Sequence, residues 1–103
     1  MIKLSKEEQK KMEKSVAEAM ESPYFKKEFD EAPSEECRDY IRYTYYSGDY
    51  YDPDAENVKY FDDLQEKVEN ALSADDWEYL KRLAPNSPFV GYCDEKIKAL
   101  SAK

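Results

Sequence analysis

The stretch that decides the fold is residues 58–72, with the sequence VKYFDDLQEKVENAL. Its apolar side chains recur every three or four residues, which is the spacing of one face of an α-helix. These side chains are Val58, Phe61, Leu64, Val68, Ala71 and Leu72. Just before them, Asp52 can cap a helix and Pro53 suits a first helical position. The sequence therefore predicts a helix over about 53–72.

Two further helices are predicted after this stretch. Ser73 and Asp76 have the spacing of a capping box, in which a hydroxyl and a carboxylate each satisfy an unpaired backbone N–H at the helix start. The helix that starts here is the fifth along the chain. Its apolar residues are Trp77, Leu80 and Leu83, and Pro85 ends it. The Ser-Pro pair at 87–88 opens a last helix. Its apolar residues are Phe89, Val90, Cys93, Ile97 and Leu100.

Three helices are predicted before residue 52. Ser5 and Glu8 form another capping-box pair, and the apolar spacing that follows predicts a helix over about 6–21. The Ser-Pro pair at 22–23 opens a short second helix, with an apolar face of Tyr24, Phe25 and Phe29. The third helix begins at 33–34 and runs to about Tyr46. Gly48 predicts its end, because glycine accepts the left-handed conformation of a helix C-terminus.

These elements predict an all-α fold, a small bundle of five to six short helices. No linker rich in Gly or Ser divides the chain, so residues 1–103 are expected to form a single all-helical domain. The expected core is Val16, Met20, Phe25, Phe29, Ile41, Phe61, Leu64, Val68, Leu72, Trp77, Leu80, Ile97 and Leu100.

The composition leaves room for only a thin core. Leu, Ile, Val and Phe account for 17 of 103 residues, which is below the roughly 20% that warns of disorder in a highly charged chain. Ten Tyr, one Trp and three Met compensate, because these side chains also bury large areas. We therefore expect an ordered domain of modest stability.

The net charge of −8 excludes several classes of partner. Proteins bind nucleic-acid phosphates and anionic membranes through Lys and Arg, which this chain has in deficit. No apolar run approaches the roughly 20 residues of a membrane span, and the N-terminal residues show no secretory signal. The expected location is the cytoplasm, with no direct contact to nucleic acid or membrane.

The acidic residues and the tyrosines are concentrated in the middle of the sequence. Residues 21–80 carry a net charge of −12 and contain nine of the ten Tyr and the only Trp. A helical projection places Asp39, Tyr43 and Tyr46 opposite the apolar side of the third helix. On the fourth helix, four acids, Glu69 included, face away from the apolar stripe. We therefore expect an outward surface made of Asp39, Tyr43, Tyr46, Asp49, Tyr50, Tyr51, Asp52, Asp54, Asp62, Asp63 and Glu66.

The residue types argue against catalysis. The chain has no His, so it lacks an imidazole base and the usual zinc ligand. Its two isolated Gly do not make a phosphate-binding loop. The acids of 52–63 alternate as in a calcium loop, but Asn57 replaces the required Gly and Asp63 the required Glu. We expect no enzyme activity, no cofactor and no metal site.

The two cysteines lie on apolar stripes of their helices. Cys37 and Cys93 are therefore expected to be small core residues. The sequence does not decide whether they stay free or form a disulfide.

Two functions fit these features. The first is a small acidic protein-binding module, an inhibitor or regulator of the immunity, antitoxin or phage-inhibitor type. It would use the acidic, tyrosine-rich surface to cover a basic, nucleic-acid-binding surface of a partner such as a nuclease or toxin. The alternative is a helical assembly or adaptor subunit that self-associates, or docks a partner, through its aromatic surface. The sequence identifies neither the partner nor the oligomeric state.

Overall fold

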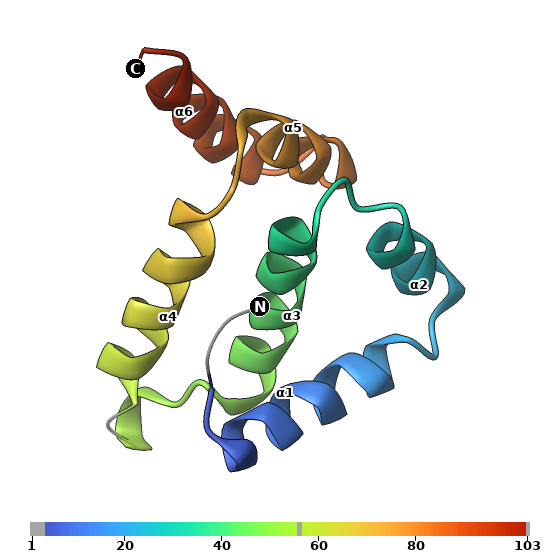
Figure 1. The fold of residues 1–103 in the computed structure, drawn as a ribbon, viewed down its shortest axis with the longest axis vertical. Helices are drawn as coiled ribbons and strands as arrows, with labels where there is room; N and C mark the ends of the chain where they lie inside the picture. The colour runs from blue at the N-terminus through green and yellow to red at the C-terminus, as the bar shows by residue number, and fades with distance from the viewer. Residues whose placement is uncertain (1–3, 56, 103) are drawn as a thin grey trace.

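The computed structural model describes residues 4–55 and 57–102, and in this part of the chain all regular structure is helical. Figure 1 shows the elements in order. They are α1 (Lys6–Ala19), α2 (Pro23–Asp30), α3 (Glu35–Tyr50), a 3-10 turn η1 (Pro53–Ala55), α4 (Val58–Asn70), α5 (Ala74–Leu83) and α6 (Phe89–Ser101). The predicted small all-α bundle is confirmed.

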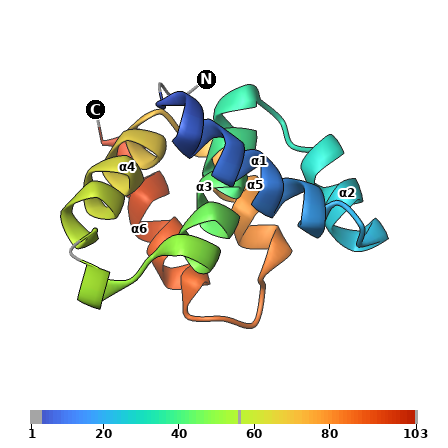
Figure 2. The same ribbon diagram turned by 90° about the horizontal axis from the view of Figure 1, so that it is seen from below.

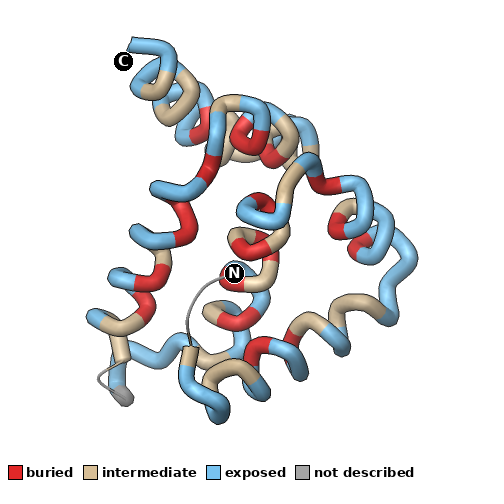
Figure 3. Tube along the Cα trace, viewed as in Figure 1, coloured by how far each residue is buried: buried red, intermediate tan, exposed pale blue. Residues whose placement is uncertain are grey.

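Helix α3 is the central element (Figures 1 and 2). Helix α1 crosses it on one side and α4 lies along another, while α5 and α6 pack on each other at one end of the bundle. Buried positions on α4 lie on the side that faces α3, and its exposed positions lie on the outer side (Figure 3). Helix α3 is thus covered from more than one direction.

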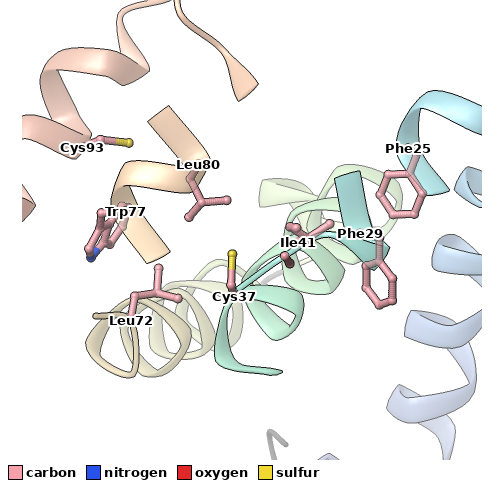
Figure 4. Packing of buried hydrophobic residues seen from close by; sticks show 9 residues of the cluster. Phe25, Phe29, Cys37, Ile41, Leu72, Trp77, Leu80 and Cys93 are labelled. Atoms are coloured by element: carbon pink, nitrogen blue, oxygen red, sulfur yellow. The ribbon is translucent and has the colours of Figure 1, made fainter. Parts of the chain in front are cut away.

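The interior consists of two neighbouring clusters. The first contains Phe25, Phe29, Ala32, Cys37, Ile41, Leu72, Trp77, Leu80 and Cys93, most of which Figure 4 shows. The second contains Met12, Tyr43, Tyr46, Phe61, Leu64 and Val68. Val16 and Tyr40 pack against both clusters, so α1 and α3 join the two parts of the core.

The predicted core is largely confirmed. Nine of its thirteen members are buried, and the other four, Val16, Met20, Ile97 and Leu100, are partly buried and pack against the first cluster. Cys37 and Cys93 are free thiols in the interior. The residues that the prediction missed are Met12, Ala32, Tyr43 and Tyr46.

Three of the predicted helix starts have their side-chain caps. The Ser5 hydroxyl accepts from the Glu8 N–H at 3.2 Å, and the Glu8 carboxylate accepts from the Ser5 N–H at 2.9 Å. Ser73 and Asp76 form the second capping box. Ser34 caps α3 by accepting from the Cys37 N–H at 3.0 Å. These bonds satisfy donors that no helical carbonyl can reach.

The two Ser-Pro starts differ from the prediction. Ser22 precedes α2 with Pro23 at the first helical position, but its hydroxyl makes no cap hydrogen bond. The Ser87 hydroxyl instead donates to the carbonyl of Ala84, and α6 starts after Pro88. At α2, the proline therefore occupies its predicted position, but the serine does not cap the helix.

Gly48 does not end α3, and this prediction is wrong. The helix continues through it to Tyr50, and Gly48 does not adopt the left-handed conformation. The Tyr51 N–H still donates to the Ser47 carbonyl at 2.8 Å, so the helical hydrogen-bond pattern extends past the glycine. The aromatic side chains after Gly48 pack on Phe61 and Tyr46, and this packing outweighs the low helix propensity of glycine.

Replacement of Gly48 with Ala is expected to raise the free energy of unfolding by about 0.5–1 kcal/mol, because Ala loses less backbone entropy in a helix. A Cβ at this position would meet no atom within 4 Å. Urea denaturation followed by circular dichroism measures the effect. A left-handed Gly48 would instead make the Ala variant less stable.

Helix α4 starts later than predicted. The Asn57 side chain accepts from the Asp52 N–H and donates to the Tyr50 carbonyl, both at 3.0 Å. The Asp52 carboxylate also accepts from the Asp54 N–H at 2.9 Å. These local side-chain bonds hold the backbone in a turn and compete with helix formation. As a result, residues 53–55 form a 3-10 turn and the α-helix begins at Val58.

Across the described residues, no helix combines the length and the apolar character needed to cross a membrane.

Candidate functional site

The structure divides the predicted surface into a buried part and an exposed part. Asp39, Tyr43 and Tyr46 are 7%, 8% and 3% exposed, so the expectation that they face outward is wrong. They lie on the side of α3 that the helical projection predicts to face solvent. That side is covered because α1 and α4 both pack against α3.

The two buried tyrosines have structural partners. The Tyr43 hydroxyl donates to the Phe61 carbonyl at 3.4 Å. The Tyr46 and Tyr60 hydroxyls share a hydrogen bond of 3.1 Å, and the Tyr46 ring lies 5.2 Å from that of Phe61. Both tyrosines therefore connect α3 to α4 and are not available to a partner in this conformation.

Asp39 belongs to an ion-pair group on α3. The Arg42 guanidinium donates to the Asp39 and Glu35 carboxylates, each at 2.7 Å. The same guanidinium lies 5.0 Å from the centre of the Phe29 ring. Its hydrogen bond is the main cause that lowers the pKa of Glu35 from its ordinary value. Asp39 thus forms a buried ion pair within α3 and does not face solvent.

Glu69 is also buried, although the helical projection placed it on the solvent side of α4. It accepts hydrogen bonds from Tyr92 and from Gln65, and the Lys96 ammonium lies 3.5 Å away. Helix α6 supplies Tyr92 and Lys96, so this carboxylate joins α4 to α6. Burial, and then the hydrogen bond to Glu69, raise the pKa of Tyr92.

The rest of the predicted surface is accessible. We define the acidic patch as its six exposed carboxylates, Asp49, Asp52, Asp54, Asp62, Asp63 and Glu66. The first three lie at the end of α3 and in the turn that follows, and the other three lie on the outer side of α4. Glu66 follows the start of α4 by eight residues, so it lies about 12 Å along the helix from there. The patch therefore extends over the turn and two turns of α4.

The patch contains little compensating charge. Between residues 48 and 66 the sequence has seven acids and one base, Lys59. Lys59 lies 3.1 Å from the Asp63 carboxylate, in an exposed i, i+4 pair. Such pairs contribute little free energy and leave the other carboxylates unneutralised. The result is a local excess of negative charge.

The aromatic share of this surface is smaller than predicted. Tyr51 is 42% exposed and rests on Phe61, with ring centres 5.7 Å apart. Tyr50 is half-buried against Tyr46, and the Lys11 ammonium lies 5.6 Å from its ring centre. One exposed tyrosine and part of another therefore accompany the carboxylates.

A second feature of the surface was not predicted. We call it the aromatic groove, an open cavity of about 430 Å³ between α2, α3, α5 and the start of α6. Its apolar walls are Phe25, Tyr40, Ile41, Tyr45, Leu80 and Phe89. Glu28 and Thr44 are its polar lining residues. Four separate segments contribute these side chains, so no local sequence pattern indicates the groove.

The cysteines have the properties of core residues. Burial is the main cause that raises the pKa of Cys37 to about 12 and that of Cys93 to about 11. Because the thiolate is the reactive form, both side chains are poor nucleophiles at neutral pH. Among the described residues, no three His, Cys, Asp or Glu side chains converge as metal ligands.

Comparison of the chain with protein-family models, with curated proteins and with solved structures finds no match.

Proposed function

We propose that this chain is a small acidic protein-binding module, an inhibitor or regulator that covers a basic, nucleic-acid-binding surface of a partner protein. The observation that carries the proposal is the acidic patch, in which exposed carboxylates outnumber cations on a turn and an adjoining helix face. Immunity proteins, antitoxins and phage-encoded inhibitors are the types of protein that this description fits.

The patch suits such a partner for a physical reason. A surface that binds nucleic acid presents Arg and Lys spaced to meet phosphates. Carboxylates at similar spacing pair with the same side chains and speed the encounter through long-range attraction. The cytoplasm, where such partners are found, is part of the proposal.

The local structure favours preorganised binding. Asn57 fixes the turn through hydrogen bonds to the backbone of Tyr50 and Asp52. Tyr51 is held against Phe61 with two-fifths of its surface exposed. A partner would therefore meet carboxylates and one aromatic ring whose positions cost little entropy to fix.

A charge-matched pair of variants tests the proposal. The first replaces four members of the acidic patch, Asp52→Asn, Asp54→Asn, Asp62→Asn and Glu66→Gln. The control replaces four exposed acids outside it, Glu18→Gln, Glu21→Gln, Glu31→Gln and Glu95→Gln. Both variants change the net charge by the same amount, so a difference between them reports position and not total charge.

Affinity capture from the native host, at about 50 mM and about 500 mM salt, is the measurement. We expect the wild type and the control to retain one basic protein at low salt, and the patch variant to lose it. High salt should weaken the complex by roughly tenfold or more, because screening removes exposed charge attraction. Nucleic acid should compete for the captured protein.

The alternative function gives the opposite salt response. An assembly or adaptor subunit that docks through aromatic contacts, or pairs with a second copy, would bind as well or better at high salt. Of the exposed tyrosines Tyr24, Tyr45, Tyr51 and Tyr92, only Tyr51 lies in the turn that carries part of the acidic patch, which favours the charge-led function. Equal capture by the two variants, undiminished at high salt, would contradict the proposal.

A further inference from the structure

The aromatic groove has the composition of a binding site for an organic cation. Two aromatic pairs line it. The Phe25 and Tyr45 rings lie 4.6 Å apart in an edge-to-face arrangement, and those of Tyr40 and Phe89 are stacked 6.4 Å apart. The cavity of about 430 Å³ lies within the range of small-molecule sites, roughly 300–1,000 Å³. It is large enough for two aromatic rings of a ligand.

The charge at the groove indicates the charge of the ligand that it would prefer. Among the lining residues that the structure describes, Glu28 is the charged one, and its carboxylate has no hydrogen bond or ion pair with another described residue. The Tyr79 hydroxyl donates to the Glu28 carbonyl and thereby ties this part of α2 to α5. Glu28 is half-buried, and a carboxylate beside apolar walls favours a cation over a neutral or anionic group.

Elsewhere in the fold, three aromatic rings have a Lys or Arg side chain close to the ring. Lys11 lies 5.6 Å from the Tyr50 ring centre, Arg42 lies 5.0 Å from that of Phe29, and Lys96 lies 5.3 Å from that of Tyr92. No such cation covers the four groove rings from within the described residues. A cation over an aromatic face is attracted by the negative charge of the ring face. The groove thus offers rings and a carboxylate, and among the described residues no cation lies over those rings.

From these observations we propose that the aromatic groove binds a small organic amine, protonated at neutral pH, with an aromatic or branched apolar body. The apolar body fills the space between the two aromatic pairs, and the ammonium group lies near the Glu28 carboxylate. This site is separate from the acidic patch in its residues, so the proposal does not depend on the proposed function.

Three probes of similar shape and different charge test the proposal. They are 3,3-diphenylpropylamine as the cation, 3,3-diphenylpropan-1-ol as the neutral analogue and 3,3-diphenylpropionate as the anion. Binding is followed by two-dimensional NMR of the labelled full chain. We expect the amine to shift resonances of Ile41, Tyr45 and Leu80, with a dissociation constant on the order of 0.1–1 mM. The alcohol should bind more weakly and the carboxylate most weakly.

Two pairs of variants test the residues. Glu28→Gln should weaken amine binding about three- to fivefold and leave binding of the alcohol unchanged, whereas the control Glu31→Gln should change neither. Tyr45→Ala should weaken amine binding roughly tenfold, and Tyr45→Phe should preserve it because the ring remains. The NMR spectrum of each variant reports whether it is folded.

Several outcomes would overturn the proposal. These are equal binding of the three probes, shifts confined to residues outside the groove, the absence of binding at millimolar amine, or an unchanged amine affinity in Glu28→Gln. Tighter binding of a Lys-containing tripeptide with aromatic neighbours than of the amine would also overturn it, because the occupant would then be a protein segment.

Discussion

Replacement of Trp77 with Ala is expected to lower the free energy of unfolding by about 3–5 kcal/mol, the largest effect of any substitution considered. Trp77 is 1% exposed and is the largest fully buried side chain. Its ring lies 5.7 Å from that of Tyr40 and 5.8 Å from that of Tyr92. Removal of the indole leaves a cavity among helices α3, α5 and α6.

The thin core makes this loss of stability severe for the whole domain. A domain of this length has a total stability of roughly 5–15 kcal/mol, and the low content of large aliphatic residues favours the lower end. Loss of about 3–5 kcal/mol would therefore unfold a large fraction of the molecules at physiological temperature. The neighbouring rings of Tyr40, Phe89 and Tyr92 are rigid and cannot collapse fully into the space.

Thermal and urea denaturation monitored by circular dichroism measure the change, because the variant lacks the single tryptophan needed for fluorescence. Tyr24→Ala is the matched control, because that aromatic side chain is 81% exposed. Its replacement should lower the free energy of unfolding by less than about 0.5 kcal/mol. Similar losses in the two variants would show that Trp77 is not buried as described.

The structural features that the sequence predicted are those set by neighbours within a few residues. The capping boxes at Ser5 and Ser73 depend on a hydroxyl and a carboxylate three residues apart, and both formed. The stripe over 58–72 depends only on helical spacing, and its members Phe61, Leu64, Val68 and Leu72 are buried. Local chemistry is sufficient for features of this kind.

The exposure of the α3 side chains could not be read from local chemistry. A helical projection shows which residues share a side, but it does not show how many neighbours the helix has. The projection places Asp39, Tyr43 and Tyr46 on the solvent side because Cys37 and Ile41 form an apolar side. One signal was present, since aromatic residues occur all around α3, as in a helix that is buried on several sides.

The acidic patch could be predicted from local sequence, whereas the aromatic groove could not. The carboxylates of the patch follow from composition and from the polar side of α4, and their exposure matches the prediction. The groove arises where four segments meet, and its lining depends on how α2 and α5 pack beside α3. Long-range packing of this kind leaves no periodic pattern in a single sequence.

Replacement of Asp76 with Ala is expected to lower the free energy of unfolding by about 2–4 kcal/mol. The Asp76 carboxylate is in the interior, at 3% exposure of the residue, and accepts two hydrogen bonds. One comes from the Ser73 N–H at 2.9 Å and completes the capping box of α5. The other comes from the Ser34 hydroxyl at 2.7 Å. Ser34 also caps α3, so one carboxylate joins the starts of two helices through a bond between residues 42 positions apart in the sequence.

The neighbouring substitution Asp75→Ala is the control. Asp75 is also an acid in the first turn of α5, where it interacts favourably with the helix dipole, but it is exposed. We expect this variant to lose no more than about 0.5–1 kcal/mol. The difference between the two variants, measured by urea denaturation with tryptophan fluorescence, then reports the buried hydrogen bonds and not the charge at the helix start.

A double-mutant cycle separates the link between α3 and α5 from the two caps. Ser34→Ala removes the link and the cap at Cys37, Asp76→Ala removes the link and the cap at Ser73, and the double variant counts the link only once. The two single effects should therefore exceed the double effect by about 1 kcal/mol. Strict additivity would mean that the two side chains do not interact. Because α3 and α5 both line the aromatic groove, loss of this bond should also weaken amine binding to the groove.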